Sequence, residues 1–158
     1  MIATELNPAV KPVAFLLGTW RGEGEGQYPG IQPFRYREVI TFSHNGKPFL
    51  IYTQRTEAIE SGQPMHGEAG YLRLVGEGRV EFVIAQPIGY AEIALGRVDG
   101  QRIDVECTTV ARTPTAKPVT SISRSLWLEG DTLRYELKMG MENIPLARHL
   151  TASFRRAD

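Results

Sequence analysis

Polar and apolar residues alternate along most of this chain with a period of two. The run Thr132–Met139 alternates almost throughout, and Arg79–Ala85 is rich in β-branched residues and half alternating. Such alternation is typical of a β-strand with one buried face and one wet face. Runs of this kind predict about ten short strands, at residues 17–26, 34–43, 48–58, 66–75, 79–86, 89–97, 101–110, 119–128, 132–140 and 146–156.

The segments between the predicted strands carry the residues of tight turns. Asn45-Gly46, Gly76-Glu77-Gly78 and Asp99-Gly100 are examples, since Gly, Asn and Asp tolerate the positive φ of hairpin turns. Regularly spaced strands joined in this way predict an antiparallel up-and-down meander. Closing the sheet removes its unpaired edges, so we predict an all-β protein built as an antiparallel β-barrel of about ten strands. A barrel wider than about eight strands has room for a ligand among its interior side chains.

The N-terminal segment departs from this alternation. Asn7 suits the N-cap of a helix and Pro8 its first position, while Pro12 excludes a long regular helix. We therefore expect one or two short helical turns that plug one end of the barrel with Val13 and Phe15.

A glycine-rich segment opens the first predicted strand. Gly18, Gly22 and Gly24 share a strand face with Trp20, which permits close approach of backbone or ligand. No helix and no Lys-Ser/Thr pair follows, so the segment is not a phosphate-binding loop. We expect a structural strand corner that packs near the closed end of the barrel and affects a ligand only indirectly.

Composition narrows the classes of function. The 158 residues suffice for one domain with a sizeable core, and we expect a single domain over residues 1–158. The 18 Lys+Arg balance the 18 Asp+Glu, which argues against nucleic-acid and anionic-membrane partners. The single cysteine, Cys107, excludes an intramolecular disulfide. No signal-peptide pattern and no apolar run of roughly 20 residues occurs, so we expect a soluble, cytoplasmic protein.

Candidate chemistry is sparse outside the histidines. No Ser-His-Asp order, pair of catalytic carboxylates or nucleophile elbow is evident, and the spacing of His44, His66 and His149 does not predict a metal site of about three protein ligands. A neutral imidazole beside a cavity can nevertheless bind haem iron, which makes His149 the strongest candidate. A lone His in a C-terminal strand is more often a surface or hydrogen-bonded residue.

Strand parity does not decide where His149 points. It shares parity with Thr151 and Ser153, whereas Leu150 and Phe154 face the other way. A filled barrel would turn the apolar face inward, but a barrel that holds a ligand allows the reverse near its mouth.

Several short motifs, in order along nearly the whole chain, resemble those of the nitrobindin family of haem-binding β-barrels. The first is the Gly-x-Trp-x-Gly-x-Gly signature at residues 18–24. The others are Tyr28-Pro29, Gln32-Pro33-Phe34-Arg35-Tyr36, Ser43-His44, Pro64-Met65-His66, Glu68-x-Gly70, Ala85-Gln86 and Arg148-His149-Leu150. Any one of these motifs is weak evidence, but their combination and order are specific.

The resemblance implies a barrel like those of lipocalins and fatty-acid-binding proteins, with one b-type haem per chain at an open end. It implies that His149 is the proximal iron ligand and that the cavity is lined by Phe34, Met65, His66, Gln86 and Met139. The implied activity is isomerisation of peroxynitrite to nitrate at ferric haem, with nitric oxide as a further ligand and a homodimer left open. Gly30 stands where the family pattern has Thr, which puts one contact to the haem edge in doubt.

Two alternatives remain at this point. The first is a non-enzymatic carrier of a fatty acid or another small hydrophobic ligand, which would usually need an internal basic residue for the carboxylate. The strongest strand candidates, Arg73 and Arg134, alternate with apolar neighbours and are predicted to face solvent. The second is a haem sensor or nitric-oxide carrier without turnover, which would use the same haem ligand.

Overall fold

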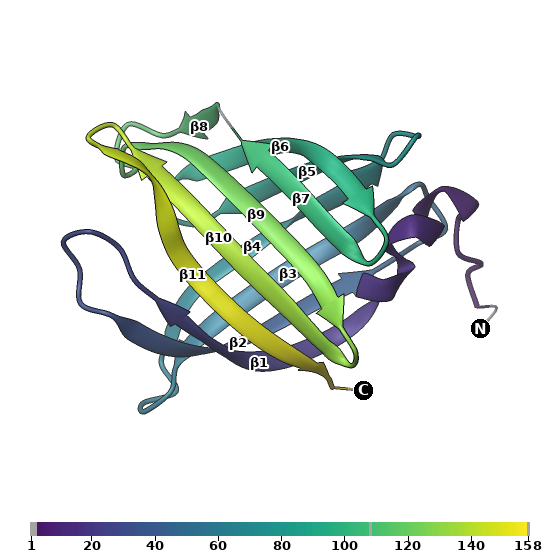
Figure 1. Ribbon diagram of the computed structural model, residues 1–158, viewed down its shortest axis with the longest axis horizontal. Coiled ribbons are helices and arrows are strands. Elements are labelled where there is room, and N and C mark those ends of the chain that lie inside the picture. The colour runs from purple at the N-terminus through teal and green to yellow at the C-terminus, as the bar shows by residue number, and fades with distance from the viewer. Residues whose placement is uncertain (1–2, 108, 158) are drawn as a thin grey trace.

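The computed structural model describes residues 3–107 and 109–157, and within them the strands form one closed antiparallel barrel (Figure 1). The described strands are β1 (Gly18–Gly26), β2 (Phe34–Ser43), β3 (Phe49–Ala58), β4 (Pro64–Leu74), β5 (Arg79–Gln86), β6 (Tyr90–Asp99), β7 (Arg102–Cys107), β8 (Val110–Arg112), β9 (Val119–Glu129), β10 (Thr132–Met141) and β11 (Ile144–Arg156). They pair in the order β5-β4-β3-β2-β1-β11-β10-β9-β7-β6, and β5 also pairs with β6, which closes the ring. The predicted fold class is confirmed.

Most predicted strands match the observed ones to within two residues, and residues 34–43 and 79–86 match at both ends. The predicted strand 101–110 is instead two strands. β7 pairs with β9 and with the second half of β6, whereas β8 pairs only with Tyr90–Glu92 at the start of β6. The pairing with β9 ends at Cys107, so the run loses one of its two neighbours there. Position 108 of the predicted strand lies outside the described residues.

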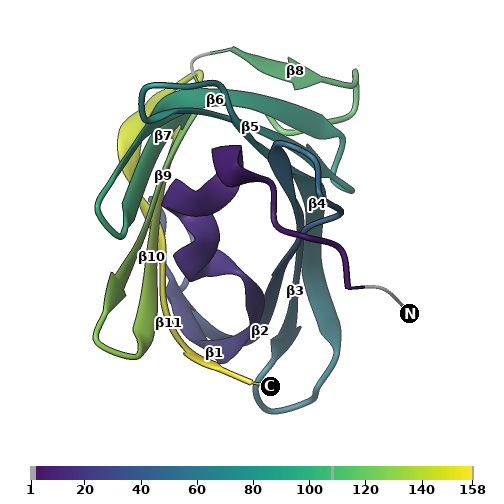
Figure 2. The ribbon, with the colours of Figure 1, turned by 90° about the vertical axis from the view of Figure 1, so that its right-hand side faces the viewer.

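The N-terminal segment is a 3₁₀-helix, η1 (Pro8–Leu16), which lies inside one end of the barrel (Figure 2). The Asn7 side chain caps it by accepting a hydrogen bond from the Ala9 backbone N–H at 3.0 Å. Val10, Val13 and Leu16 are buried at a spacing of three, the period of a 3₁₀-helix. The expected plug is present, but Phe15 is only half-buried. Phe15 does not belong to the series of residues three apart that faces the barrel interior.

The glycine-rich strand β1 packs tightly from Trp20 to Gly26. Trp20 is 1% exposed and donates its indole N–H to the Leu16 carbonyl at 2.8 Å, which ties β1 to the helix. A Cβ at Gly22 would overlap the backbone carbonyl of Ser153 on β11, and one at Gly24 would overlap the Tyr36 ring. The close packing of β1 against its neighbours therefore extends from the plugged end toward the open end. The sequence had indicated it only near the closed end.

We predict that Gly22→Ala destabilises the protein by about 1–3 kcal/mol, because β1 must move away from β11 to admit the methyl group. Gly67→Ala in β4 is the matched control, since a Cβ there meets only the Gln54 carbonyl at 3.4 Å. Chemical denaturation of both variants measures the difference. Equal stabilities would show that β1 relaxes without cost.

Candidate functional site

A cavity of about 200 Å³ lies inside the barrel at the end opposite η1. Its apolar lining comprises Phe34, Met65, Ile88, Ile122, Leu137, Met139 and Leu150. Its polar lining comprises Tyr36, Gln54, Thr56, His66, Glu68, Gln86, Tyr90 and His149. The six residues expected around a haem, namely Phe34, Met65, His66, Gln86, Met139 and His149, all lie on this one cavity.

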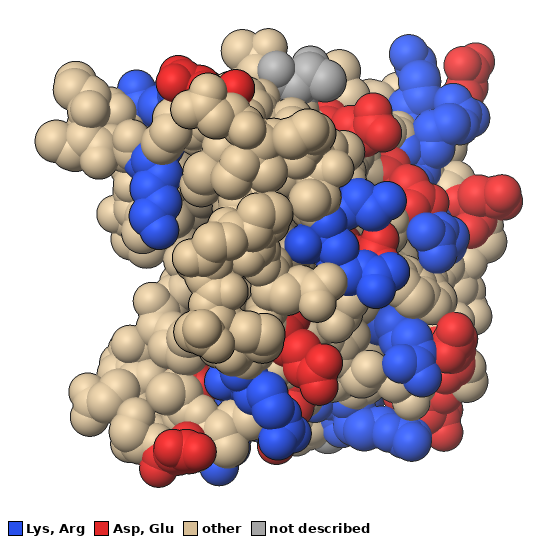
Figure 3. All heavy atoms as spheres, turned by 60° about the vertical axis from the view of Figure 1, so that its left-hand side comes forward, with Lys and Arg blue, Asp and Glu red and all other residues tan. Residues whose placement is uncertain are grey.

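The rim of the barrel at this end is apolar. Ile31, Met65, Ile88 and Leu146 are large hydrophobic residues that are each about half exposed, and they come from four different connections or strand starts. Figure 3 shows this side of the molecule with an indentation on the left that only uncharged residues border, between two lobes that carry charged side chains. The four exposed side chains therefore make part of the rim of this cavity apolar.

A β-bulge in β11 brings His149 to the cavity. Leu137 of β10 pairs with Leu150, but the next residue, Lys138, pairs with Arg148, so His149 is the extra residue on β11. A bulge places two residues opposite one and re-aims a side chain. His149 and Leu150 consequently both line the cavity, although they are neighbours in the chain. This resolves the question that strand parity left open.

Hydrogen bonding and burial favour one form of the His149 imidazole. Its Nδ1 lies 3.1 Å from the Gln27 carbonyl oxygen, an acceptor, so Nδ1 carries the hydrogen and Nε2 keeps a free lone pair. Burial lowers the pKa of His149, and the Gln27 contact opposes this only in part. The Tyr28 ring meets the imidazole edge-on at a centroid distance of 5.2 Å. A neutral, oriented imidazole of this kind is the form that binds metals.

A buried ion cluster lies next to the cavity, and one of its residues, Glu68, lines it. Arg124 on β9 is 2% exposed and lies between Glu68 on β4 and Glu92 on β6. Its guanidinium contacts the carboxylate oxygens of Glu68 at 2.9 Å and those of Glu92 at 2.6 and 3.0 Å. The Tyr52 hydroxyl also donates to Glu68 at 2.9 Å. Burial alone would raise the pKa of Glu68, but the positive charge of Arg124 outweighs it and holds that pKa at about 2.

A second buried carboxyl behaves in the opposite way. Glu38 is 2% exposed, and burial raises its pKa to about 8 even though Gln54 donates a hydrogen bond to it at 2.8 Å. The Tyr36 hydroxyl, Glu38 Oε2 and Gln54 Oε1 are buried without a hydrogen-bond partner among the described residues. A protonated Glu38 holds its hydrogen on Oε2, because Oε1 accepts from Gln54.

The sequence analysis did not identify these buried charged residues. Their place in the alternation could have indicated them, because each occupies an inward-facing position of its strand. Arg124 lies between Ile122 and Leu126 on the same buried face of β9. Glu38, Glu68 and Glu92 likewise occupy buried positions of their strands. Arg73 and Arg134 instead face solvent, where they pair with Glu81 at 3.1 Å and Glu129 at 2.6 Å.

Gly30 lies at the tip of the β1–β2 connection, away from the packed residues. Its φ is +84°, and nothing lies within 4 Å of the position that a Cβ would take. A Thr there would be strained in this backbone conformation. Whether this position contacts a haem edge stays a prediction.

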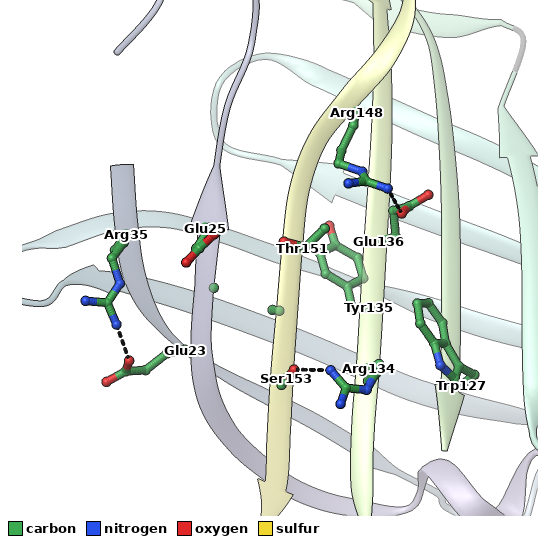
Figure 4. Close-up of a pocket in the computed structure, with 12 residues that line it drawn as sticks. Glu23, Glu25, Arg35, Trp127, Arg134, Tyr135, Glu136, Arg148, Thr151 and Ser153 are labelled. Atoms are coloured by element: carbon green, nitrogen blue, oxygen red, sulfur yellow. Dashed lines mark hydrogen bonds and ion pairs between the residues drawn. The ribbon is translucent and has the colours of Figure 1, made fainter. Parts of the chain in front are cut away.

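A larger depression, of about 370 Å³, lies on the outer face of the barrel over β1, β10 and β11 (Figure 4). Its polar contacts include an Arg35–Glu23 pair at 2.9 Å, an Arg148–Glu136 pair at 3.2 Å and a hydrogen bond from Arg134 to Ser153 at 3.1 Å. Solvent-exposed ion pairs and hydrogen bonds of this kind contribute little to the stability of the fold. The predicted ligand residues all lie on the interior cavity and none lies on this depression, so the interior cavity is the candidate site.

Among residues 3–107 and 109–157, no three His, Cys, Asp or Glu side chains are grouped as a metal site. No helix within the same residues is long and apolar enough to span a membrane.

The fold and the cavity define a closed β-barrel protein whose interior cavity is lined by two imidazoles, those of His66 and His149. Residues 9–156 match the sequence profile of the THAP4-like, heme-binding beta-barrel domain. The chain therefore belongs to this family of haem-binding barrels, as the resemblance in its motifs predicted.

Similar proteins support the same conclusion. A protein of Mycobacterium marinum named peroxynitrite isomerase 2 is 49% identical over 156 residues, which cover 96% of this chain and 97% of that protein. A Nocardia farcinica protein named peroxynitrite isomerase is 47% identical over 155 residues, covering 96% and 92% of the two chains. The crystal structure of Rv2717c from M. tuberculosis superposes with a TM-score of 0.90 at 45% identity, covering 98% of this chain and 100% of that one.

Glu38→Gln tests the raised pKa inside the barrel. With a pKa of about 8 when folded and 4.5 as the ordinary value, Glu38 keeps a proton that the unfolded chain releases. Its stabilising contribution is therefore complete below pH 4.5 and is lost as the pH rises to about 8. Relative to the variant, the wild type should lose up to about 1.4 kcal/mol of unfolding free energy per pH unit in this window.

Urea denaturation of both proteins at pH 5, 6, 7 and 8 measures this difference. Groups that titrate equally in both proteins cancel in the comparison. Parallel stability curves would show that Glu38 is ionised in the folded protein.

Proposed function

We propose that the protein binds one b-type haem per chain in the interior cavity, with His149 as the axial iron ligand, and isomerises peroxynitrite to nitrate. The observation that carries the proposal is the His149 imidazole, oriented by Gln27 and presented to the cavity by a β-bulge. Membership of a haem-binding family and the names of its relatives support the cofactor and the reaction.

The residues present fit a haem on three counts. The Nδ1 contact to a backbone carbonyl leaves Nε2 available, which is the usual arrangement of a metal-bound histidine. Phe34, Met139 and Leu150 supply apolar surface beside it, as a macrocycle requires. The rim is apolar and hollowed, so part of a large planar ligand can sit at the mouth.

The bound haem would supply the ferric iron at which peroxynitrite rearranges and at which nitric oxide binds. The chain's own residues hold and surround this centre. His149 would hold the iron from one wall, and Gln86 on β5 lies five strands away in either direction around the barrel. Met65, His66 and Gln86 therefore shape the opposite wall, where a small anion would be held.

The alternative of a fatty-acid carrier is disfavoured by Arg124. It is the internal base that such a carrier would use, but two carboxylates already occupy its guanidinium. A fatty-acid carboxylate would have to displace a buried Glu and leave it unpaired, which is costly. Co-purified lipid that haem does not displace, identified by mass spectrometry, would revive this alternative.

His149→Ala should weaken the binding of hemin at least about tenfold and shift the Soret band, because the axial nitrogen is lost. Absorption titration of the apo-protein with hemin measures both effects. His149→Gly should recover the wild-type band when free imidazole is added. His44→Ala, which follows β2 at the end that η1 plugs, is the matched control and should bind hemin normally.

Identical spectra for wild type and His149→Ala would refute the axial assignment, and a wild type that binds no hemin would refute the whole proposal. Stopped-flow decay of peroxynitrite with nitrate analysis then separates an isomerase from a nitric-oxide carrier. Decay no faster with holoprotein than with buffer would leave only the carrier.

A further inference from the structure

Two polar side chains on the wall opposite His149 are each held by a buried carboxylate. His66 Nε2 lies 3.3 Å from Oε1 of Glu68. The Gln86 side-chain nitrogen donates to Oε2 of Glu92 at 2.5 Å. Both polar groups line the cavity, so the direction of each depends on a residue behind it.

Both carboxylates are in turn held by the same guanidinium. Arg124 uses Nε and Nη2 toward Glu92 and Nη1 and Nη2 toward Glu68, at 2.6 to 3.0 Å. Only a planar fork with five N–H donors can contact two carboxylates in this way. Glu68, Glu92 and Arg124 come from β4, β6 and β9, so their contacts cross the barrel interior and do not follow one strand.

We propose that Arg124 is a positioning residue for the wall opposite His149. By fixing Glu68 and Glu92, it sets the directions of His66 and Gln86 together. The inference rests on the proposed function only in the identity of the ligand that these two side chains would face. The orientation itself is a property of the apo-protein.

The contacts dictate which atoms are left for a ligand. Glu68 accepts from Arg124 and Tyr52, so it is an acceptor toward His66, and the hydrogen of His66 lies on Nε2. Glu92 accepts from Arg124 on both oxygens, which turns the amide nitrogen of Gln86 toward it. The Gln86 carbonyl oxygen and second amide hydrogen remain for the cavity.

Three variants distinguish a loss of this positioning from a general loss of stability. Glu68→Gln should change the ring signals of His66 and leave Gln86 unchanged, while Glu92→Gln should do the reverse. Arg124→Lys keeps a positive charge but cannot hold both carboxylates, so it should change both. Side-chain NMR of the apo-protein measures the His66 ring signals and the mobility of the Gln86 amide. On release, that amide should become as mobile as the exposed side chain of Gln101.

Arg134→Lys is the control, because Arg134 pairs with Glu129 at the surface. Unchanged His66 and Gln86 signals in Arg124→Lys would overturn the proposal and make Arg124 a purely structural residue. If Arg124→Lys does not fold, the two isosteric Gln variants decide, since the proposal fails if either leaves its own partner unchanged.

The haem-loaded protein gives a second measurement. The carbon monoxide stretching band of the ferrous complex senses polar groups near the iron, and it should broaden or split in Arg124→Lys. The rate constant for peroxynitrite should fall on the order of ten- to a hundredfold, the range expected for misplaced groups. A normal NMR pattern in a protein that binds no haem would leave the positioning intact and refute only the proposed function.

Discussion

The structure depends on how the barrel accommodates Arg124. A guanidinium that is 2% exposed must be paired, since burying an isolated charge is prohibitively costly. Glu68 and Glu92 supply the pairing, and Tyr52 and Gln86 add hydrogen bonds to the two carboxylates. Removing one partner of such a cluster typically costs about 3–5 kcal/mol, because an uncompensated buried charge remains.

The position of this cluster divides the barrel interior into two parts. On the side of η1, aromatic rings such as Phe42, Tyr52 and Phe82 pack with centroid distances of 5.0 to 6.5 Å. On the other side Glu68 lines the cavity, together with His66 and Gln86, which the two carboxylates hold. Collapse of the cavity onto the core would require the apolar lining to displace groups that are already hydrogen-bonded. The cluster therefore fixes the depth of the site as well as the orientation of its wall.

The alternation of polar and apolar residues determined most of the fold but not the site. Turn residues located the strand ends well, as at residues 34–43 and 79–86, because each hairpin needs its own backbone conformation. The burial of Arg124 was not predicted. A charged residue among the inward-facing positions of a strand gives no sign by itself of the carboxylates that would pair with it. Those partners lie on strands far away in the sequence. The cavity-lining residues were suggested by the family resemblance, not by the pattern.

His149 shows most clearly why local pattern is insufficient. Its parity places it with Thr151 and Ser153, yet one extra residue in the β10–β11 pairing turns it to the same side as Leu150. The bulge depends on the register between two strands, which neither strand specifies alone. The start of the β1–β2 connection then fixes the ring, because Gln27 both donates its N–H to the His149 carbonyl at 2.8 Å and accepts from the imidazole.

The glycine-rich strand connects the two ends of the barrel. At one end Trp20 anchors β1 to the helix, while Gly24 and Gly26 leave space that the rings of Tyr36 and Phe34 occupy at the other. A side chain at either glycine would push these rings into the cavity that they line. Close packing at β1 and open space at the ligand site are thus two consequences of the same small residues. The width of the cavity is set from outside its lining, by residues that a ligand does not touch.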